Sequence, residues 1–248
     1  MVNEVDSIKY DVILIEPKTE GNIGAIARLC NNFSADRLVL VSPQTNHLSS
    51  ETKNRAKHSI NYLEDVKIYN SLEEIRDNYS VLIGTSAKAG KTYNVLRQPV
   101  YPWNLHEITI PSECKLGIVF GREDRGLSNE EIELCDFLIT IPTPGHHKVM
   151  NISHAVSIIL YEFWKRITEI ESIDSEAISS SYKEKKILFD IFNEITDSLN
   201  YEDYRKPIVQ HTFRTVINRS FASKEEIHSM IGMFKTIAQK MHETNSSD

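Results

Sequence analysis

The sequence predicts an α/β protein with a parallel sheet, followed by a small all-helical module. The first 141 residues contain six short apolar runs, each nearly continuous rather than alternating, as in strands that are covered on both faces. Helical patterns separate these runs, which is typical of a strand–helix–strand architecture. Beyond a stretch rich in Ser and Glu, only helical patterns remain.

Each predicted strand is a run of Val, Ile, Leu or Phe, and the runs lie at 12–15, 38–41, 66–69, 81–84, 116–120 and 137–141. Two helix starts between them carry capping boxes. Ser71 stands three residues before Glu74, and Ser128 three residues before Glu131, so that hydroxyl and carboxylate can satisfy free backbone N–H groups. The last helix of this part is predicted to begin near Ser153.

The chain is predicted to divide into an α/β domain at 1–170, a linker at 171–182 and a helical module at 183–248. Few large apolar residues and many Ser and Glu mark the linker. Within the module, one apolar stripe begins at Ile187, Pro207 is expected to start a second helix, and Ser223 with Glu226 forms a third capping box.

Composition narrows the class of protein. The 248 residues are 40% apolar and 25% charged with a net charge of −7, as in an ordinary soluble domain. No run approaches the roughly 18 apolar residues of a membrane span, so no membrane partner is expected. The cysteines have no CxxC spacing and are interpreted as reduced thiols of a cytoplasmic protein.

The stretch "GNIGAIARLCNNF" follows the first strand almost without a gap. Gly21 and Gly24 would let a ligand or another chain approach the backbone, and Arg28 stands one and a half turns further on. A dinucleotide-binding fingerprint requires GxGxxG and an acidic residue after the next strand, and neither is present. A nicotinamide-dependent reductase is therefore excluded, whereas a tight turn with a surface arginine remains an alternative.

Two more stretches follow strand ends. "FGREDRGLS" places charged residues after Gly121, where Glu123 and Asp124 suggest a carboxylate pair or a solvated loop. "IPTPGHHKVMNISHAV" contains His146, His147 and His154 without a Cys or carboxylate to complete a metal site. Because ligands gather at the carboxyl ends of parallel strands, we expect the ends carrying Gly84, Gly121 and Ile141 to form a pocket. Few side chains with reactive groups stand near these strand ends. The pocket is therefore suited to a flat apolar group that is held mainly by backbone N–H and C=O groups.

These three stretches, with "NISHAVSIILYE" as the third, resemble the motifs of the SpoU (TrmH) branch of the SPOUT methyltransferases. The resemblance covers roughly residues 8–168 and is closest to the TrmJ type, tRNA 2′-O-methyltransferases acting at position 32 of the anticodon loop. Three motifs in order and in the right strand context are far more specific than one. A helical extension after a linker is similar to that type as well.

The resemblance implies a deep trefoil knot, a homodimer in which the partner's first motif completes each site, and S-adenosylmethionine as cofactor, with no metal. By motif position it assigns the cofactor contacts to Thr85, Ser86, Ala87, Gly121, Ile141, Val149 and Met150. It places Asn22 and Arg28 beside the substrate and gives Glu123 and Asn151 an organising role. Val149 departs from the serine that many members carry.

An RNA partner must be reconciled with the negative net charge. Between Tyr201 and Lys240 seven basic residues stand against four acidic ones, and "KNRAKH" adds a second basic patch. Phosphate contacts from such patches dominate RNA affinity, although each single cation can also be an ordinary solvated side chain. The residues predicted to bind RNA are Lys53, Arg55, Arg205, Lys206, Arg214 and Arg219.

The predicted reaction is displacement at the sulfonium methyl by a ribose 2′-oxygen, whose proton must leave as the bond forms. The family proposal makes Arg28 the base. Because arginine stays charged, we favour Arg28 as a cation that stabilises the developing alkoxide. Two alternatives remain open: a 2′-O-methyltransferase acting on ribosomal RNA, and a noncatalytic RNA-binding knot protein.

Overall fold

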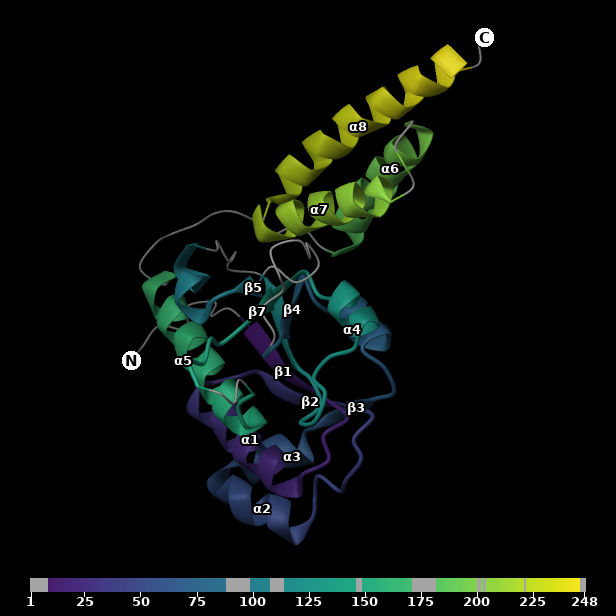
Figure 1. Ribbon diagram of the computed structural model, residues 1–248. Coiled ribbons are helices and arrows are strands. Elements are labelled where there is room, and N and C mark those ends of the chain that lie inside the picture. The colour runs from purple at the N-terminus through teal and green to yellow at the C-terminus, as the bar shows by residue number, and fades with distance from the viewer. Residues whose placement is uncertain are drawn as a thin grey trace.

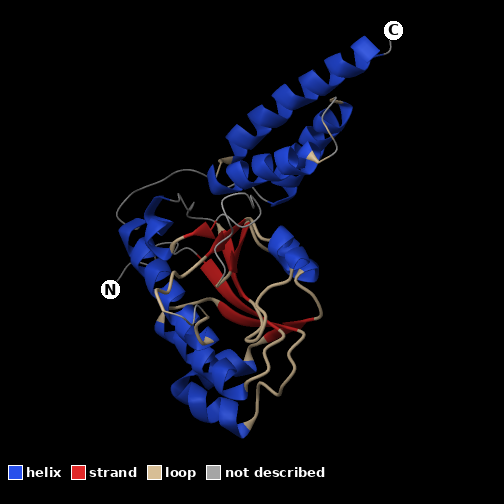
Figure 2. Ribbon diagram, viewed as in Figure 1, coloured by secondary structure: helices blue, strands red, loops and turns tan. Residues whose placement is uncertain are grey.

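The computed structural model describes residues 9–87, 99–107, 114–145, 149–170, 182–199, 202, 204–220 and 222–245. Its centre is a parallel seven-stranded sheet in the order β3-β2-β1-β6-β4-β7-β5 (Figure 2). The strands are β1 (Lys9–Ile15), β2 (Arg37–Val41), β3 (Lys67–Tyr69), β4 (Val81–Thr85), β5 (Pro99–Val100), β6 (Lys115–Phe120) and β7 (Phe137–Ile139). The six predicted strands are confirmed. Two-residue β5 is too short to give a pattern in the sequence.

Helices cover both faces of the sheet, as Figure 1 shows. One face packs against α1 (Glu20–Asn32), α3 (Ile60–Glu64) and α5 (Ile152–Ile170), and α2 (Ser50–Ala56) lies against α1. The other face packs against α4 (Asn129–Leu134) and the 3₁₀ helix η2 (Glu73–Asn78). Two further 3₁₀ turns are η1 (Lys57–Ser59) and η4 (Pro102–Glu107).

Strands buried on both faces explain the continuous apolar runs. Val12 and Leu14 of β1 pack into one core, and Ile13 and Ile15 into the other. Residues alternate between the faces of a strand, so both sets must be apolar when both faces are covered. Burial of this kind contributes roughly 25 cal/mol per Å² of apolar surface.

The predicted capping boxes have different outcomes. At Ser128 the box is complete and opens α4. At Ser71 only half of it forms: the Ser71 hydroxyl accepts from the Glu74 N–H, but the Glu74 carboxylate accepts from the N–H of Asn70. The element that follows is the 3₁₀ helix η2 rather than an α-helix.

Three helices follow the α/β part: α6 (Tyr182–Ser198), α7 (Arg205–Ser220) and α8 (Lys224–Asn245). They lie together beyond one end of the sheet in Figure 1 and share an apolar cluster around Leu188, Phe189 and Ile227. The Ser223–Glu226 box is confirmed at the start of α8. Pro207 lies in the first turn of α7, two residues after its start. All but the last residue of the predicted linker lie outside the described residues.

Part of the apolar stripe predicted for α6 faces outward. Leu188 and Ile195 are buried as expected, but Ile187 is 48% exposed and Leu199 39% exposed. The side chain of Lys185 is buried instead, and desolvation lowers the pKa of its ammonium group. Tertiary contacts of α6 therefore select a slightly different helix face from the one that periodicity alone indicated.

Candidate active site

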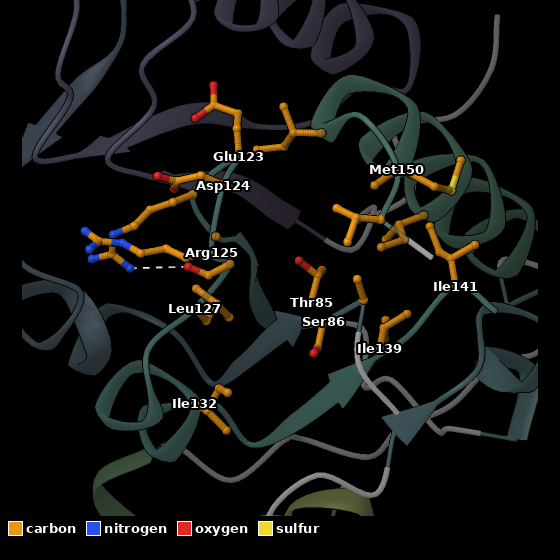
Figure 3. Close-up of a pocket in the computed structure, with 18 residues that line it drawn as sticks. Thr85, Ser86, Glu123, Asp124, Arg125, Leu127, Ile132, Ile139, Ile141 and Met150 are labelled. Atoms are coloured by element: carbon orange, nitrogen blue, oxygen red, sulfur yellow. Dashed lines mark hydrogen bonds between the residues drawn. The ribbon is translucent and has the colours of Figure 1, made fainter. Parts of the chain in front are cut away.

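A cavity of about 230 Å³ lies at the carboxyl ends of β4, β6 and β7, which are neighbours in the sheet. Figure 3 shows its lining residues. All seven residues that the resemblance assigns to the cofactor line this cavity: Thr85, Ser86, Ala87, Gly121, Ile141, Val149 and Met150. These residues come from segments that are about 65 residues apart in the sequence and that meet because parallel strands end at one edge of the sheet.

Sequence reasoning missed the apolar wall of the cavity. Leu127 and Ile132 from the region of α4, Ile139 from β7, and Ile152 and Ile159 from α5 line it as well. Strand or helix periodicity already accounts for apolar residues such as Ile139, Ile152 and Ile159, and nothing in the sequence separates a core side chain from one that borders a cavity. The mixture of apolar walls and strand-end backbone is typical of a small-molecule site.

Polar groups of the strand ends are already oriented by the fold. The Thr85 hydroxyl donates to the carbonyl of Val119 at 3.0 Å, and the Ser86 N–H donates to the carbonyl of Ile139 at 3.0 Å. These bonds tie β4 to both of its neighbours at the point where the cavity opens. Val149 is 66% exposed and lies on the rim of the cavity.

Gly121 lines the cavity and also has a structural role within the loop that follows β6. A Cβ at this position would meet the backbone carbon of Gly126 at 2.2 Å and the nitrogen of Leu127 at 2.4 Å. The glycine therefore allows the 121–126 loop to fold back on itself, and Gly126 completes the turn with a φ of 74°. The space beside Gly84 is likewise occupied by protein, since an added Cβ would lie 2.6 Å from Leu138 Cδ2.

Arg122 holds this loop in place. Its guanidinium donates to Glu16 after β1 at 2.5 Å and to Glu131 of α4 at 2.9 Å. The hydrogen bond from Arg122 is the main reason that the pKa of Glu16 falls to about 2. Arg125 also pairs with Glu16 at 3.1 Å. Sequence reasoning missed Arg122, because a charged residue in a loop gives no signal of the partners that it will find.

Glu123 connects the first two motifs. Its carboxylate accepts from the backbone N–H groups of Lys18 and Thr19 at 3.3 to 3.4 Å and from the side-chain amide of Asn22 at 3.3 Å. It thus lies at the N-terminus of α1, where a carboxylate is favoured by free N–H groups and the helix dipole. Asp124 turns to the ammonium group of Lys18 instead, at 2.7 Å.

Asn151 joins the third motif to the first. Its amide nitrogen donates to Oδ1 of Asn22 at 3.3 Å, while its own oxygen accepts from the N–H and the hydroxyl of Ser153 at 2.9 and 2.7 Å. Glu123, Asn22 and Asn151 therefore form one hydrogen-bonded chain, which we call the motif relay. The three motifs thus meet within one protomer, although 129 residues separate Asn22 from Asn151, whereas the resemblance assigned the first motif of each site to the partner subunit.

Arg28 does not line the cavity. It lies in an open groove bordered by α1, α2 and α5, together with Arg55, Lys57 and His154. Gly24 explains how α1 and α2 come so close, since its Cβ would lie 2.2 Å from the carbonyl oxygen of Thr52. The backbone that approaches this glycine is that of α2, so the prediction that Gly24 clears space for a ligand or another chain was wrong.

The residues predicted to bind RNA differ in their surroundings. Lys53 and Arg55 are exposed on α2, and Arg205 is exposed at the start of α7. The other three make contacts within the helices. Lys206 donates to the carbonyl of Asp197 at 3.3 Å, Arg214 lies 5.5 Å from the ring centroid of Phe189, and Arg219 is half-buried, which lowers its pKa.

The remaining sequence predictions concern metal, membrane and cysteines. His146 and His147 lie outside the described residues, and among those described no three ligating side chains gather as a metal site would require. No helix in the described part of the chain has the length and apolar character to cross a membrane. Cys30, Cys114 and Cys135 are all buried thiols.

Comparison with known proteins gives the same assignment as the motifs. Residues 9–161 match the SpoU rRNA Methylase family. The chain is 35% identical over 229 residues to the tRNA (cytidine-2′-O-)-methyltransferase TrmJ of Methanocaldococcus jannaschii, covering 92% of this chain and 99% of that protein. It is 30% identical over 239 residues to the protein of the same name from Sulfolobus acidocaldarius, covering 96% and 97%.

Among solved structures, TrmJ from Z. mobilis ZM4 has a TM-score of 0.65 at 22% identity and covers 92% of this chain and 98% of that one. At this identity the likeness concerns the fold alone. The family match spans more than half of the chain and includes all three motifs. This protein belongs to the SpoU methylase family.

Proposed function

We propose that this protein transfers a methyl group from S-adenosylmethionine to a ribose 2′-oxygen of tRNA, at position 32 of the anticodon loop. The observation that carries the proposal is the meeting of a strand-end cavity with the motif relay. Relatives named as tRNA 2′-O-methyltransferases support the substrate class. The three buried thiols suit the reducing cytoplasm, where we place the protein.

The cavity fits this cofactor. Its apolar wall, with Leu127, Ile139 and Ile152, suits a flat adenine ring, and the backbone at Ser86, Gly121 and Ile141 offers hydrogen-bonding groups beside it. When bound, S-adenosylmethionine supplies an electrophilic sulfonium methyl group. We assign the cofactor contacts to the seven predicted residues at the strand ends, as given above.

The chain's own residues would prepare the ribose hydroxyl. Arg28 offers a permanent positive charge that stabilises the oxygen as its proton leaves. The motif relay fixes the start of α1 against the cofactor loop and the start of α5, which aligns the reacting groups. The reaction requires no metal in this scheme.

Homodimer formation is part of the proposal. Within one protomer Arg28 lines the groove and not the cavity, so Arg28 of the partner subunit is needed to complete each site. An exposed apolar surface on η4 and α5 is suited to such a contact: Trp103, Tyr161 and Trp164 are 45 to 54% exposed. Burial of aromatic side chains of this size is typical of subunit interfaces.

We also propose the finer organisation of the chain. The SPOUT domain at 1–170 would contain a trefoil knot formed by its C-terminal part, a linker would occupy 171–182, and 183–248 would be a helical RNA-binding module. Family membership supports the knot, and the shared apolar cluster of α6, α7 and α8 supports a separate module. Lys53, Arg55, Arg205, Lys206, Arg214 and Arg219 would contact RNA phosphates.

The direct test incubates the purified protein with unmodified tRNA and S-adenosylmethionine and maps ribose methylation by mass spectrometry. One new 2′-O-methyl group at position 32 is expected. Methylation of ribosomal RNA but not of tRNA would contradict the proposal that tRNA is the substrate. Binding of S-adenosylhomocysteine without methylation of either RNA would contradict the proposal that the protein is an active methyltransferase.

A further inference from the structure

Lys185 is a buried cation near the start of α6 that the proposed reaction does not use. It is 1% exposed, and no other lysine in the described part of the chain is buried. Among the residues that the structure describes, its ammonium nitrogen has no hydrogen-bond partner. An ammonium group that leaves water without a partner loses its hydration and gains no bond in return. Burial of Lys185 therefore costs free energy.

The groups that surround Lys185 belong to the α/β part of the chain. Asp136, Cys114 and Arg76 act electrostatically on its ammonium group. Asp136 directly precedes β7, and Cys114 directly precedes β6. In addition, α7 contacts β7. The helical module is therefore docked on the amino ends of these strands, and Lys185 lies in the interface.

The carboxylate of Asp136 already has partners of its own. One oxygen accepts from the guanidinium of Arg76 at 2.8 Å, and the other accepts from the backbone N–H of Leu82 at 2.7 Å. Asp136 and Arg76 form a buried ion pair whose charges balance each other. Desolvation lowers the pKa of Lys185, and the opposing effect of Asp136 is smaller. Within the described residues, the ammonium group thus remains as an uncompensated positive charge in the interface.

This charge makes the docking of the module weaker than its packing alone would make it. Docking removes the ammonium group of Lys185 from water, and release returns it to water. For the same reason, buried ionic groups can often be replaced by apolar side chains of similar size with a gain of stability. The docked and released positions are therefore closer in free energy than a wholly apolar interface would make them.

The docked module lies away from the reaction site. The cofactor cavity is at the carboxyl ends of β4, β6 and β7. The module lies at the amino ends of β6 and β7, beyond one end of the sheet in Figure 1. Parallel strands separate these two ends by the length of the sheet. A docked module is thus too far from the cavity of its own protomer to contact the nucleotides beside the target ribose.

We propose that the docked module is a resting state, that tRNA binding releases it from the amino end of the sheet, and that buried Lys185 keeps the docking weak enough for this release. The inference rests on the proposed function and deepens it, because it adds a conformational step before methylation. Only a released module can bring its basic residues onto RNA that occupies the cavity. Because tRNA then binds the released state more tightly, it shifts the population toward that state.

Lys185→Met tests the role of the buried charge, because methionine keeps an unbranched apolar side chain and removes the ammonium group. The melting temperature should rise by about 2–4 °C. Amide hydrogen exchange at residues 136–138, at the amino end of β7, should become slower because docking is tighter. The affinity for unmodified tRNA should fall about fivefold below that of the control variant, since tRNA must open a more stable docked state.

Lys186→Met is the matched control. Lys186 is exposed on the same helix, so its substitution removes one positive charge from the module without changing the interface. Its melting temperature and its hydrogen exchange at 136–138 should equal those of the wild type. If Lys185→Met melts below the wild type, or exchanges faster at 136–138, the lysine does not weaken docking and the proposal is wrong.

Hydrogen exchange of the wild-type protein with and without unmodified tRNA tests the release itself. The amides at 136–138 should exchange faster when tRNA is bound. Unchanged exchange in a protein that binds and methylates tRNA normally would overturn the release and leave the proposed function intact. A wild-type protein that binds no tRNA would overturn the proposed function and the release with it.

Discussion

The side-chain amide of Asn151 donates a hydrogen bond to Oδ1 of Asn22 across 3.3 Å. Asn22 in turn donates to the carboxylate of Glu123 at 3.3 Å. Through these two contacts the N-terminal ends of α1 and α5 are held against the loop that follows β6. A local change at any of the three residues should therefore affect the alignment of the whole site.

Glu123→Gln tests the motif relay. The amide keeps the size of the side chain but removes the charge that accepts from Lys18, Thr19 and Asn22. We expect kcat/KM for tRNA methylation to fall on the order of tenfold to a hundredfold, since small misplacements are costly. The free energy of unfolding should change by only about 1 kcal/mol.

Glu133→Gln provides the control for this variant. Glu133 is exposed on α4 and does not line the cavity, so the substitution removes one negative charge away from the site. Equal losses of activity in both variants would mean that net charge, rather than the relay, sets the rate.

Substitutions of Arg28 distinguish a charge role from a base role. Arg28→Lys keeps the positive charge and should retain more activity than Arg28→Ala, which should lose about a hundredfold to a thousandfold in kcat. Single-turnover methylation assays at saturating tRNA would measure the difference. Equal and complete loss in both variants would contradict a simple charge role.

Mixed dimers test whether Arg28 acts across the subunit interface. Ala155→Phe should fill the cavity that Ala155 lines, and calorimetry should show that it no longer binds S-adenosylhomocysteine. Coexpression with Arg28→Ala gives heterodimers with one complete site, so activity should return to about a quarter of the wild-type value. A mixture that stays inactive would show that Arg28 serves its own protomer.

Gly24→Ala and Gly232→Ala should change stability in opposite directions. A methyl group at Gly24 would lie 2.2 Å from the Thr52 carbonyl oxygen, so we expect a loss of about 1–3 kcal/mol. Gly232 lies within α8 with no atom within 4 Å of its Cβ position, so alanine should stabilise the protein by about 0.5–1 kcal/mol. Urea unfolding curves would measure both. A stable Gly24→Ala would show that α1 and α2 are not held in close contact.

Acid should weaken the Glu16–Arg122 contact. The hydrogen bond from Arg122 lowers the pKa of Glu16 from 4.5 to about 2, so the folded state binds its proton less readily than the unfolded chain. After solvent screening, the Glu16–Arg122 contact contributes on the order of 1–2 kcal/mol to the free energy of unfolding. This contribution is present above about pH 4.5 and is lost as the pH falls toward 2. Glu16→Gln should be less stable than the wild type at pH 6 and should approach it near pH 2. A difference that does not change with pH would contradict this account.

The sequence determined the fold class and the place of the site. Continuous apolar runs at 12–15 and 116–120 indicated doubly covered strands, because side-chain alternation makes both faces apolar only when both are buried. Topology also placed a pocket at the strand ends, since parallel strands bring their carboxyl ends to one edge. The resemblance of the motifs to a known family, rather than periodicity, assigned seven residues to the cofactor, and all seven are among those that line the cavity.

Tertiary structure decided what the pattern of residues could not. The space beside Gly24 and beside Gly121 is occupied by the protein's own backbone. Arg122 donates hydrogen bonds to Glu16 and Glu131. Arg28 lines a groove rather than the cavity. Each of these depends on which distant segment packs against a given residue. A single sequence carries the propensity of each segment, but the partners of a glycine or a charged side chain are fixed only when the helices and strands pack together.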